Sequence, residues 1–432
     1  MNTSAINPVD TTWLLVATGL VLLMTPALAF FYGGLVRAKN ALNTMMMSFA
    51  ALGVVMLTWA LAAYSLAFAP GASWLGGLQH VLMRGVGLEA KGTVPHLLFF
   101  AYQGTFAVIT AALVSGAVVE RMRFGAFAGF MAGWTLLVYA PVCHWVWGGG
   151  WLSSLGALDF AGGTVVHINA GTAALVAALV LGSRKDHGRQ AFLPHNVPFV
   201  LLGAALLWFG WLGFNGGSAG GANTAAVLAF VNTILAPAAT LFVWMALDFS
   251  RTGKTTAVGA ATGIVVGLVA ITPAAGFVGP LAAIVIGAVA TFPSYYGILW
   301  RSRTRLDDSL DVAAAHGLGG VVGALLTGVF AQAAWGGTDG LIAGRPIQLG
   351  IQALGVLATV AYSAAVSFGL LKLIALVAPL RATRRDEGTG LDVGEHGEEA
   401  YTSGEGAVLL APDAVLPAAV RTGALGAVRS EA

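Results

Sequence analysis

Residues 162–182 read GGTVVHINAGTAALVAALVLG, and residues 311–330 read DVAAAHGLGGVVGALLTGVF. Each stretch is apolar enough to lie in a lipid bilayer, and each contains one histidine, His167 or His316. An ionisable side chain inside a membrane is costly to bury, so it commonly marks a transport path or a counter-ion site. The two stretches come from opposite halves of the chain, which suggests that both imidazoles line one pore.

The composition indicates a polytopic membrane protein. Of the 432 residues 57% are hydrophobic and 9% are charged, whereas a typical soluble domain is roughly 25% charged. The single cysteine, Cys143, excludes an intrachain disulfide. The first residues lack a positively charged region, so we interpret the first apolar stretch as a membrane helix and not as a signal peptide.

A membrane-spanning helix needs about 20 mostly apolar residues. By this criterion we predict an all-α fold with eleven transmembrane helices. These segments start near residues 11, 43, 96, 124, 163, 196, 223, 256, 278, 313 and 349. We place the transmembrane domain at residues 1–381 and a cytoplasmic regulatory tail at residues 382–432, where the sequence becomes charged and rich in Gly and Ala.

The basic residues between the segments predict the orientation. Cytoplasmic loops carry an excess of Lys and Arg, and the richer set of alternating connections includes Arg37, Arg184, Arg251 and Arg303. The opposite set holds only Arg84, Lys91 and Arg345. This bias places the N-terminus outside and the C-terminus in the cytoplasm, in agreement with an odd number of spans.

The odd number also favours a 5+5 inverted repeat plus one helix, in which the two histidines lie on the fifth and tenth spans. Transporters with such repeats hold their sites at the repeat interface. One difficulty is that His167 falls about one turn from the outer end of its span and His316 about one turn from the inner end of its own. The two side chains meet only if vestibules penetrate the protein or the helices begin deep inside it.

Several runs, in order along the chain, resemble the ammonium transporter family (Amt/Mep, of the Amt/Mep/Rh superfamily). They are FFYGGLVRAKN (30–40), AYQGTFA (101–107), HWVWGGGWL (144–152), LDFAGGTVVHINAG (158–171), WFGWLGFNGGSAG (208–220), DDSLDVAAAHG (307–317) and GLDVGEHGEEAY (390–401). The resemblance implies an eleven-helix fold, a homotrimer with one pore per subunit, ammonium or ammonia as substrate, and a place in the plasma membrane.

The same resemblance assigns roles to individual residues. Trp147 and Ser218 match the outer recruitment site, and His167 and His316 match the twin histidines of the pore. Phe106 and Phe214 match a stacked phenyl gate, while Asp159 and Trp211 match supporting positions. One departure is Tyr102, where many bacterial members have Phe; its hydroxyl could alter the affinity of the outer site.

These residue types suit the chemistry of ammonium. Attraction between a cation and a Trp face reaches about 2 kcal/mol when the pair is desolvated, so Trp147, with Tyr102 and Phe106 beside it, can bind a small cation. Ser218 can accept a hydrogen bond that ammonium donates and potassium does not. Because a bare cation crosses hydrocarbon at great cost, we expect ammonium to lose a proton and pass the imidazoles as NH3, or to have its proton relayed separately.

Each of these residues also has an ordinary structural interpretation. Trp147 could be an interfacial tryptophan, Ser218 a helix-packing residue, and Phe106 and Phe214 core aromatics. For Asp159, just before the fifth span, the structural interpretation is favoured: a cap of that helix.

The tail segment 390–401 resembles the regulatory segment that, in many bacterial members, accompanies binding of a PII signalling trimer. We therefore expect a PII homologue as a partner at the cytoplasmic face, beside the lipid bilayer and the other subunits. The alternative is an unstructured solvated tail.

Two other functions remain open from the sequence. The chain could act mainly as an ammonium sensor, or it could be a haem-binding redox protein with the histidines as axial ligands. Enzymatic activity is not expected, because no nucleophile elbow, phosphate loop or metal-ligand spacing is present in the sequence. We likewise expect no cofactor, no metal site and no nucleic-acid partner.

Overall fold

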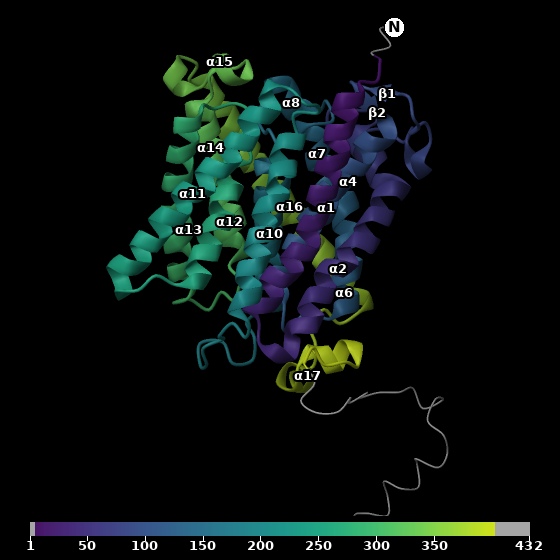
Figure 1. Cartoon of the computed structure of the whole chain (residues 1–432). Helices are drawn as coiled ribbons and strands as arrows, with labels where there is room; N and C mark the ends of the chain where they lie inside the picture. The colour runs from purple at the N-terminus through teal and green to yellow at the C-terminus, as the bar shows by residue number, and fades with distance from the viewer. Residues whose placement is uncertain (1–4, 402–432) are drawn as a thin grey trace, which may run out of the picture.

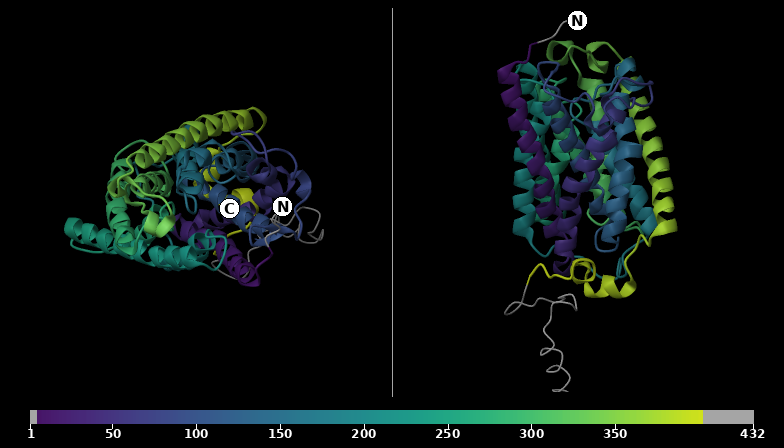
Figure 2. Two further views of the ribbon diagram at one scale, coloured as in Figure 1. Left: turned by 90° about the horizontal axis from the view of Figure 1, so that it is seen from above. Right: turned by 90° about the vertical axis from the view of Figure 1, so that its right-hand side faces the viewer.

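The apolar segments form a bundle of long helices that run between two ends of the molecule (Figures 1 and 2). This computed structural model describes residues 5–401. One end of the bundle holds β1, β2, α8 and α15, and we call it the vestibule end after the cavity described below (Figure 1). The opposite end, the tail end, holds α17. The part of the predicted regulatory tail at 402–432 lies outside the described residues.

The first half of the chain supplies the elements that build the cavity described below. They are α1 (Pro8–Leu35), η1 (Ala38–Asn40), α2 (Ala41–Thr58), η2 (Trp59–Ala63), α3 (Tyr64–Phe68), η3 (Val81–Met83), β1 (Ala90–Lys91), β2 (Val94–Pro95), α4 (His96–Leu113), α5 (Ser115–Val118), α6 (Phe124–Trp134), η4 (Thr135–Tyr139), α7 (Ala140–Val146), α8 (Trp151–Leu155), η5 (Gly163–Ile168), α9 (Asn169–Leu181) and α10 (Val197–Gly217). The strands β1 and β2 pair antiparallel, with Lys91 opposite Val94.

The second half adds the remaining helices and the docked part of the tail. They are α11 (Thr224–Thr252), α12 (Ala257–Ile271), α13 (Pro280–Arg301), η6 (Ala313–Leu318), α14 (Gly319–Phe330), α15 (Ala333–Gly336), η7 (Leu341–Ala343), α16 (Ile347–Val377), α17 (Arg384–Thr389) and η8 (Asp392–His396). Of these, η5, η6 and η8 have the wider π-helical turn.

Among the described residues, 10 helices are long and apolar enough to cross a membrane. They begin within a few residues of the predicted starts. The segment predicted from about residue 256 is the shorter helix α12, with 15 residues. It ends at Ile271, two residues before Pro273, which cannot continue a helix. The carbonyl of Pro273 accepts a hydrogen bond of 3.1 Å from the backbone N–H of Phe160.

Close helix packing depends on small residues, as expected where lipid provides no hydrophobic drive. The helices α1 and α10 pack along one another. A Cβ on Gly203 would lie 2.4 Å from the backbone nitrogen of Phe31, and a Cβ on Gly210 would lie 2.7 Å from the carbonyl oxygen of Leu20. Larger residues at these positions would push the two helices apart.

The tail up to residue 401 is docked against the tail end of the bundle. The Asp392 carboxylate accepts hydrogen bonds from the backbone N–H groups of Leu42 (3.1 Å) and Asn43 (2.7 Å), in the first turn of α2. Glu395 accepts one of 3.1 Å from Phe124, the first residue of α6. Carboxylates stabilise helix N-termini because the first N–H groups have no partner within the helix. Residues 390–401 are therefore held to the bundle.

Candidate functional site

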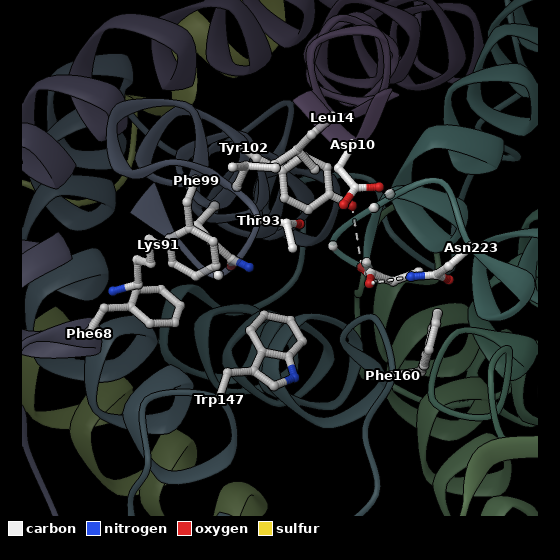
Figure 3. A pocket seen from close by; sticks show the side chains of 18 of the residues that line it. Asp10, Leu14, Phe68, Lys91, Thr93, Phe99, Tyr102, Trp147, Phe160 and Asn223 are labelled. Carbon is white, nitrogen blue, oxygen red and sulfur yellow. Dashed lines mark hydrogen bonds between the residues drawn. The ribbon is translucent and has the colours of Figure 1, made fainter. Parts of the chain in front are cut away.

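A cavity of about 710 Å³ opens at the vestibule end (Figure 3). Trp147, Tyr102 and Ser218, three residues that the sequence analysis assigned to the outer site, all line it. The chain segments that meet here come from α1, α4, α10, the β1–β2 hairpin and the end of α7. We call this cavity the vestibule.

The Trp147 ring is held in one orientation. Trp147 follows the last residue of α7, and its indole N–H donates a 2.8 Å hydrogen bond to the backbone carbonyl of Asp159. Its ring centroid lies 6.0 Å from that of Phe106, at an edge-to-face angle of 85°. Because the only polar group of the ring is already bonded, the indole presents aromatic surface to the vestibule.

Ser218 offers an acceptor to the same cavity. Its hydroxyl donates to the carbonyl of Phe214 at 2.8 Å, so the lone pairs of its oxygen remain for a donor in the vestibule. The buried Tyr102 hydroxyl lies 2.9 Å from the Phe214 carbonyl and 3.3 Å from the Ser218 oxygen. The Tyr102 hydroxyl therefore contacts Ser218, the acceptor of the site. A phenylalanine at position 102 would lack this contact.

Two stacked phenyl rings lie between the vestibule residue Trp147 and the histidines. Phe106 and Phe214 are stacked with their centroids 4.0 Å apart and their planes 18° from parallel. Each side chain is 1% exposed. The Phe106 ring also lies 5.0 Å from the Tyr102 ring. Rings at this separation leave no room for a hydrated ion.

Beyond the phenyl rings lie the two histidines. The Nδ1 atoms of His167 and His316 are 3.3 Å apart. The His167 ring stacks on Trp211 at 5.2 Å, and the Trp211 indole N–H donates a 2.8 Å hydrogen bond to Thr272. If the two Nδ1 atoms share a hydrogen bond, one imidazole donates and the other accepts, so neutral rings carry opposite tautomers.

The space beside the imidazoles is small. Both histidines line a cavity of about 10 Å³ together with Phe214, Trp211 and other apolar side chains. A volume of that size is about one water-sized probe, which suits a molecule as small as ammonia. A haem macrocycle does not fit there, so the residues present do not suit the redox interpretation.

The wider turns and buried loops explain how the histidines meet. Each histidine lies in a π-helical turn, His167 in η5 and His316 in η6, and such turns are frequent at functional sites. The loop before η5 is largely buried, as are Asp307, Asp308 and Val312 before η6. Both helices thus begin inside the protein, which removes the difficulty that simple counting of spans had raised.

Asp159 lies in the loop before η5 and is 6% exposed. Its carboxylate accepts four backbone hydrogen bonds, at 2.8 and 2.6 Å from Gly162 and Gly163 and at 2.8 and 3.0 Å from Thr164 and Val165. Its backbone carbonyl orients Trp147. Asp159 therefore acts on the site through η5 and Trp147, without lining the vestibule itself.

Two charged residues that no sequence motif singles out, Asp10 and Lys91, also line the vestibule. Asp10 accepts a 2.9 Å hydrogen bond from the backbone N–H of Ala222. In the sequence, Lys91 stands out only as one of the few basic residues in the loops predicted to lie outside. Because basic residues are scarce in those loops, a lysine there indicates a local role.

Comparison with known proteins identifies the family of the chain. The model of the Ammonium Transporter Family matches residues 12–401. The ammonium transporter of Bacillus subtilis is 48% identical over 398 residues, which cover 91% of this chain and 98% of that protein. The crystal structure of Saccharomyces cerevisiae Mep2 is similar with a TM-score of 0.85 at 37% identity, covering 94% of each chain. A solved Sensor Amt protein is similar with a TM-score of 0.84 at 30% identity, covering 90% of this chain and 98% of its own. The chain thus belongs to the ammonium transporter family.

Proposed function

We propose that this chain takes ammonium from the vestibule, removes a proton from it near the phenyl rings, and conducts it past the twin histidines. The observation that carries this proposal is the unbroken series of rings from the vestibule inward. Phe106 contacts both Trp147 and Phe214, and the Phe214 ring in turn lies 6.1 Å from the His167 ring.

Each part of this series suits one step. The Trp147 face and the Ser218 oxygen attract a cation that donates hydrogen bonds. The stacked rings of Phe106 and Phe214 exclude its hydration shell. The imidazoles of His167 and His316 then offer a donor and an acceptor to a neutral NH3 or to a proton that travels separately. Potassium has no proton to lose and so has no comparable route.

The experiment is a current measurement on a solid-supported membrane. Liposomes that contain the purified protein receive an ammonium pulse and then an equal potassium pulse. A current for ammonium alone supports selective electrogenic transport. With no current, an internal pH dye in the same liposomes distinguishes electroneutral NH3 conduction from absence of transport, and absence of transport would contradict the proposal.

A sensing role is the second candidate function. It is favoured by the similarity to a Sensor Amt protein and by the docking of residues 390–401 on the N-termini of α2 and α6. Signalling would then pass through a partner. Ammonium-dependent protection of the tail from proteolysis, in a protein that does not transport, would favour this role.

We also propose the eleven-helix inverted arrangement, in which α12 is the eighth span. Two observations support it. The loop before η5 bonds to Pro273 after α12, and the loop before η6 bonds to Gly116 in α5, since the Leu310 N–H donates to the Gly116 carbonyl at 3.0 Å. Asp159 and Asp308 precede their histidines at the same spacing, and the Asp308 carboxylate accepts a 2.7 Å hydrogen bond from Ala313 at the start of η6. In a 5+5 repeat these partners are equivalent.

The orientation can be tested with introduced cysteines, because Cys143 is the single native cysteine and is buried. With the vestibule facing outside the plasma membrane, a cysteine at Arg84 should react with an impermeant maleimide in intact cells. A cysteine at Arg303 should react only after permeabilisation. The reverse pattern would overturn the orientation.

We further propose a homotrimer and a PII-type partner at the tail end, both from the family resemblance. The exposed apolar side chains Phe242 and Leu281, at 75% and 80% exposure, are compatible with burial against lipid or other subunits. The mass of the purified complex tests the trimer. Pull-downs under varied ATP, ADP and 2-oxoglutarate test the partner, and failure to recover one under every condition would remove it.

A further inference from the structure

Lys91 lies at one side of the vestibule, with its ammonium group over aromatic rings (Figure 3). Its Nζ atom is 4.8 Å from the centroid of Phe99, 5.6 Å from that of Phe68 and 5.7 Å from that of Tyr64. Among residues 5–401 no carboxylate lies within ion-pair distance of it. The neighbouring acid Glu89 pairs with His96 instead. Lys91 is therefore a cation held by ring faces, without a compensating charge.

The position of Lys91 is fixed by the hairpin. Lys91 ends β1 and pairs with Val94 of β2, which leads directly into α4. The side chain is half-buried, and Phe99 beneath it is on α4, the helix that also carries Tyr102 and Phe106. The ammonium group thus lies beside Phe99 and Phe68, on the α4 side of the vestibule (Figure 3).

The vestibule has a second charged residue at another side. Figure 3 shows Asp10 and Asn223 away from Lys91, with Trp147 between the two sides. Of the residues that line the cavity, Asp10 and Lys91 are the two charged ones. Their charges have opposite signs. The electrostatic potential that a cation meets in the vestibule therefore depends on whether the positive charge of Lys91 is present.

We propose that Lys91 is an affinity-setting residue: a tethered cation that opposes the entry of ammonium and so weakens its recruitment between Trp147 and Ser218. This inference rests on the proposed function. Lys91 contacts neither the phenyl gate nor the histidines, so it acts on the concentration of ammonium in the vestibule and not on its passage. Its removal should therefore change the apparent KM and leave the maximal rate nearly unchanged.

The experiment compares the variants Lys91→Met and Lys91→Arg by ammonium-evoked current. Met retains an unbranched apolar chain against the rings but has no charge. We expect Lys91→Met to lower KM about two- to fivefold, the range for one unit charge acting across a partly solvated cavity. Lys91→Arg should retain the parent KM. The difference between Met and Lys should shrink at high ionic strength, because salt screens charges in a solvated vestibule.

A matched control is Arg84→Met, which removes an exposed positive charge at the same end that does not line the vestibule. It should leave KM unchanged. Three results would overturn the inference: an unchanged KM in Lys91→Met, equal KM values for the Met and Arg variants, or the same change in Arg84→Met. If Lys91→Met does not fold, Lys91→Gln replaces it. A parent protein without ammonium transport would contradict the proposed function, which is a different outcome from these.

Discussion

His167 and His316 lie with their Nδ1 atoms 3.3 Å apart, although the chain reaches them from opposite halves of the sequence. The helices that carry them also approach each other closely nearby, at Gly171 and Gly317. A Cβ added to Gly171 would lie 2.4 Å from the backbone nitrogen of Gly317. The close packing of these two helices therefore holds the two imidazoles in contact.

Replacing either histidine with alanine should lower the maximal ammonium current by about tenfold or more, the scale expected when a group that handles protons is removed. The fold should persist, because each side chain lines a narrow cavity and is not a main packing element. Solid-supported membrane currents and thermal unfolding of the same samples check both statements. Since the pair acts as one unit, the double variant should be little worse than either single variant. A double alanine variant that transports like the parent would show that the proton relay is wrong.

The glycine contact gives a matched pair of variants. A Cβ at Gly171 would meet the Gly317 backbone at 2.4 and 2.5 Å, whereas a Cβ at Gly317 would meet nothing closer than 3.6 Å. Gly171→Ala should therefore push η6 away from α9, separate the imidazoles and reduce both current and stability. Gly317→Ala should be tolerated in both assays. If the two variants behave alike, the close approach of these helices does not position the histidines.

Trp147→Leu should raise the apparent KM for ammonium more than it lowers the maximal rate. Loss of a partly desolvated cation–π contact is worth about 1–2 kcal/mol, which corresponds to about a five- to thirtyfold change in affinity. The current as a function of ammonium concentration measures it, with Trp300→Leu, an exposed tryptophan at the tail end, as the control. An unchanged KM would remove the cation–π argument for recruitment.

The helical bundle could be predicted from the sequence because membrane spans leave a strong signal of length and apolarity. The start of each span was found to within a few residues, and α12 was found as a segment although it is too short to be recognised by length alone. The sequence could not show what the chain meets after α12. There Pro273 bonds to Phe160, a residue far away in the chain.

The resemblance to the ammonium transporter family named the residues of the site. The sequence did not reveal how these residues are arranged in space. Counting residues from the ends of the spans placed His167 and His316 at different depths. The π-helical turns and the buried loops before them bring the rings to one level, and no local pattern of hydrophobic residues encodes such a turn. Similarly, Arg37 and Arg184 were interpreted only as cytoplasmic charges, whereas the structure makes them partners of a buried acid.

Asp159→Ala should destabilise the fold as well as the site. The carboxylate satisfies four backbone N–H groups at the start of η5, and leaving buried donors without a partner costs about 1–3 kcal/mol each. We expect the free energy of unfolding to fall by about 2 kcal/mol or more, since some donors will find water. Thermal unfolding in detergent measures this. Parent-like stability with lost transport would instead give Asp159 a direct role toward the substrate.

The buried acid at the tail end supports a final prediction. Glu120 is 0% exposed and contacts two arginines, Arg37 at 3.0 Å and Arg184 at 2.8 Å. Arg184 in turn pairs with Asp307 at 2.8 Å. This network joins the ends of α1, α5 and α9 to the loop before η6. Removing one partner of a buried ion pair typically costs about 3–5 kcal/mol, so Glu120→Gln should lower the unfolding temperature markedly.

The network should also make the stability of the protein depend on pH, with lower stability at low pH. Burial acts to raise the pKa of Glu120, but the charges of Arg184 and Arg37 outweigh it and hold the pKa below the ordinary value of 4.5. A carboxylate with a depressed pKa in the folded state stabilises the protein above its unfolded pKa and loses that contribution as pH falls. The parent should thus lose stability below about pH 4.5, and Glu120→Gln should reduce that dependence. The control Glu398→Gln, at an exposed position, should leave the pH dependence of stability unchanged. Equal profiles of stability against pH for the parent and Glu120→Gln would show that the network does not stabilise this end of the bundle.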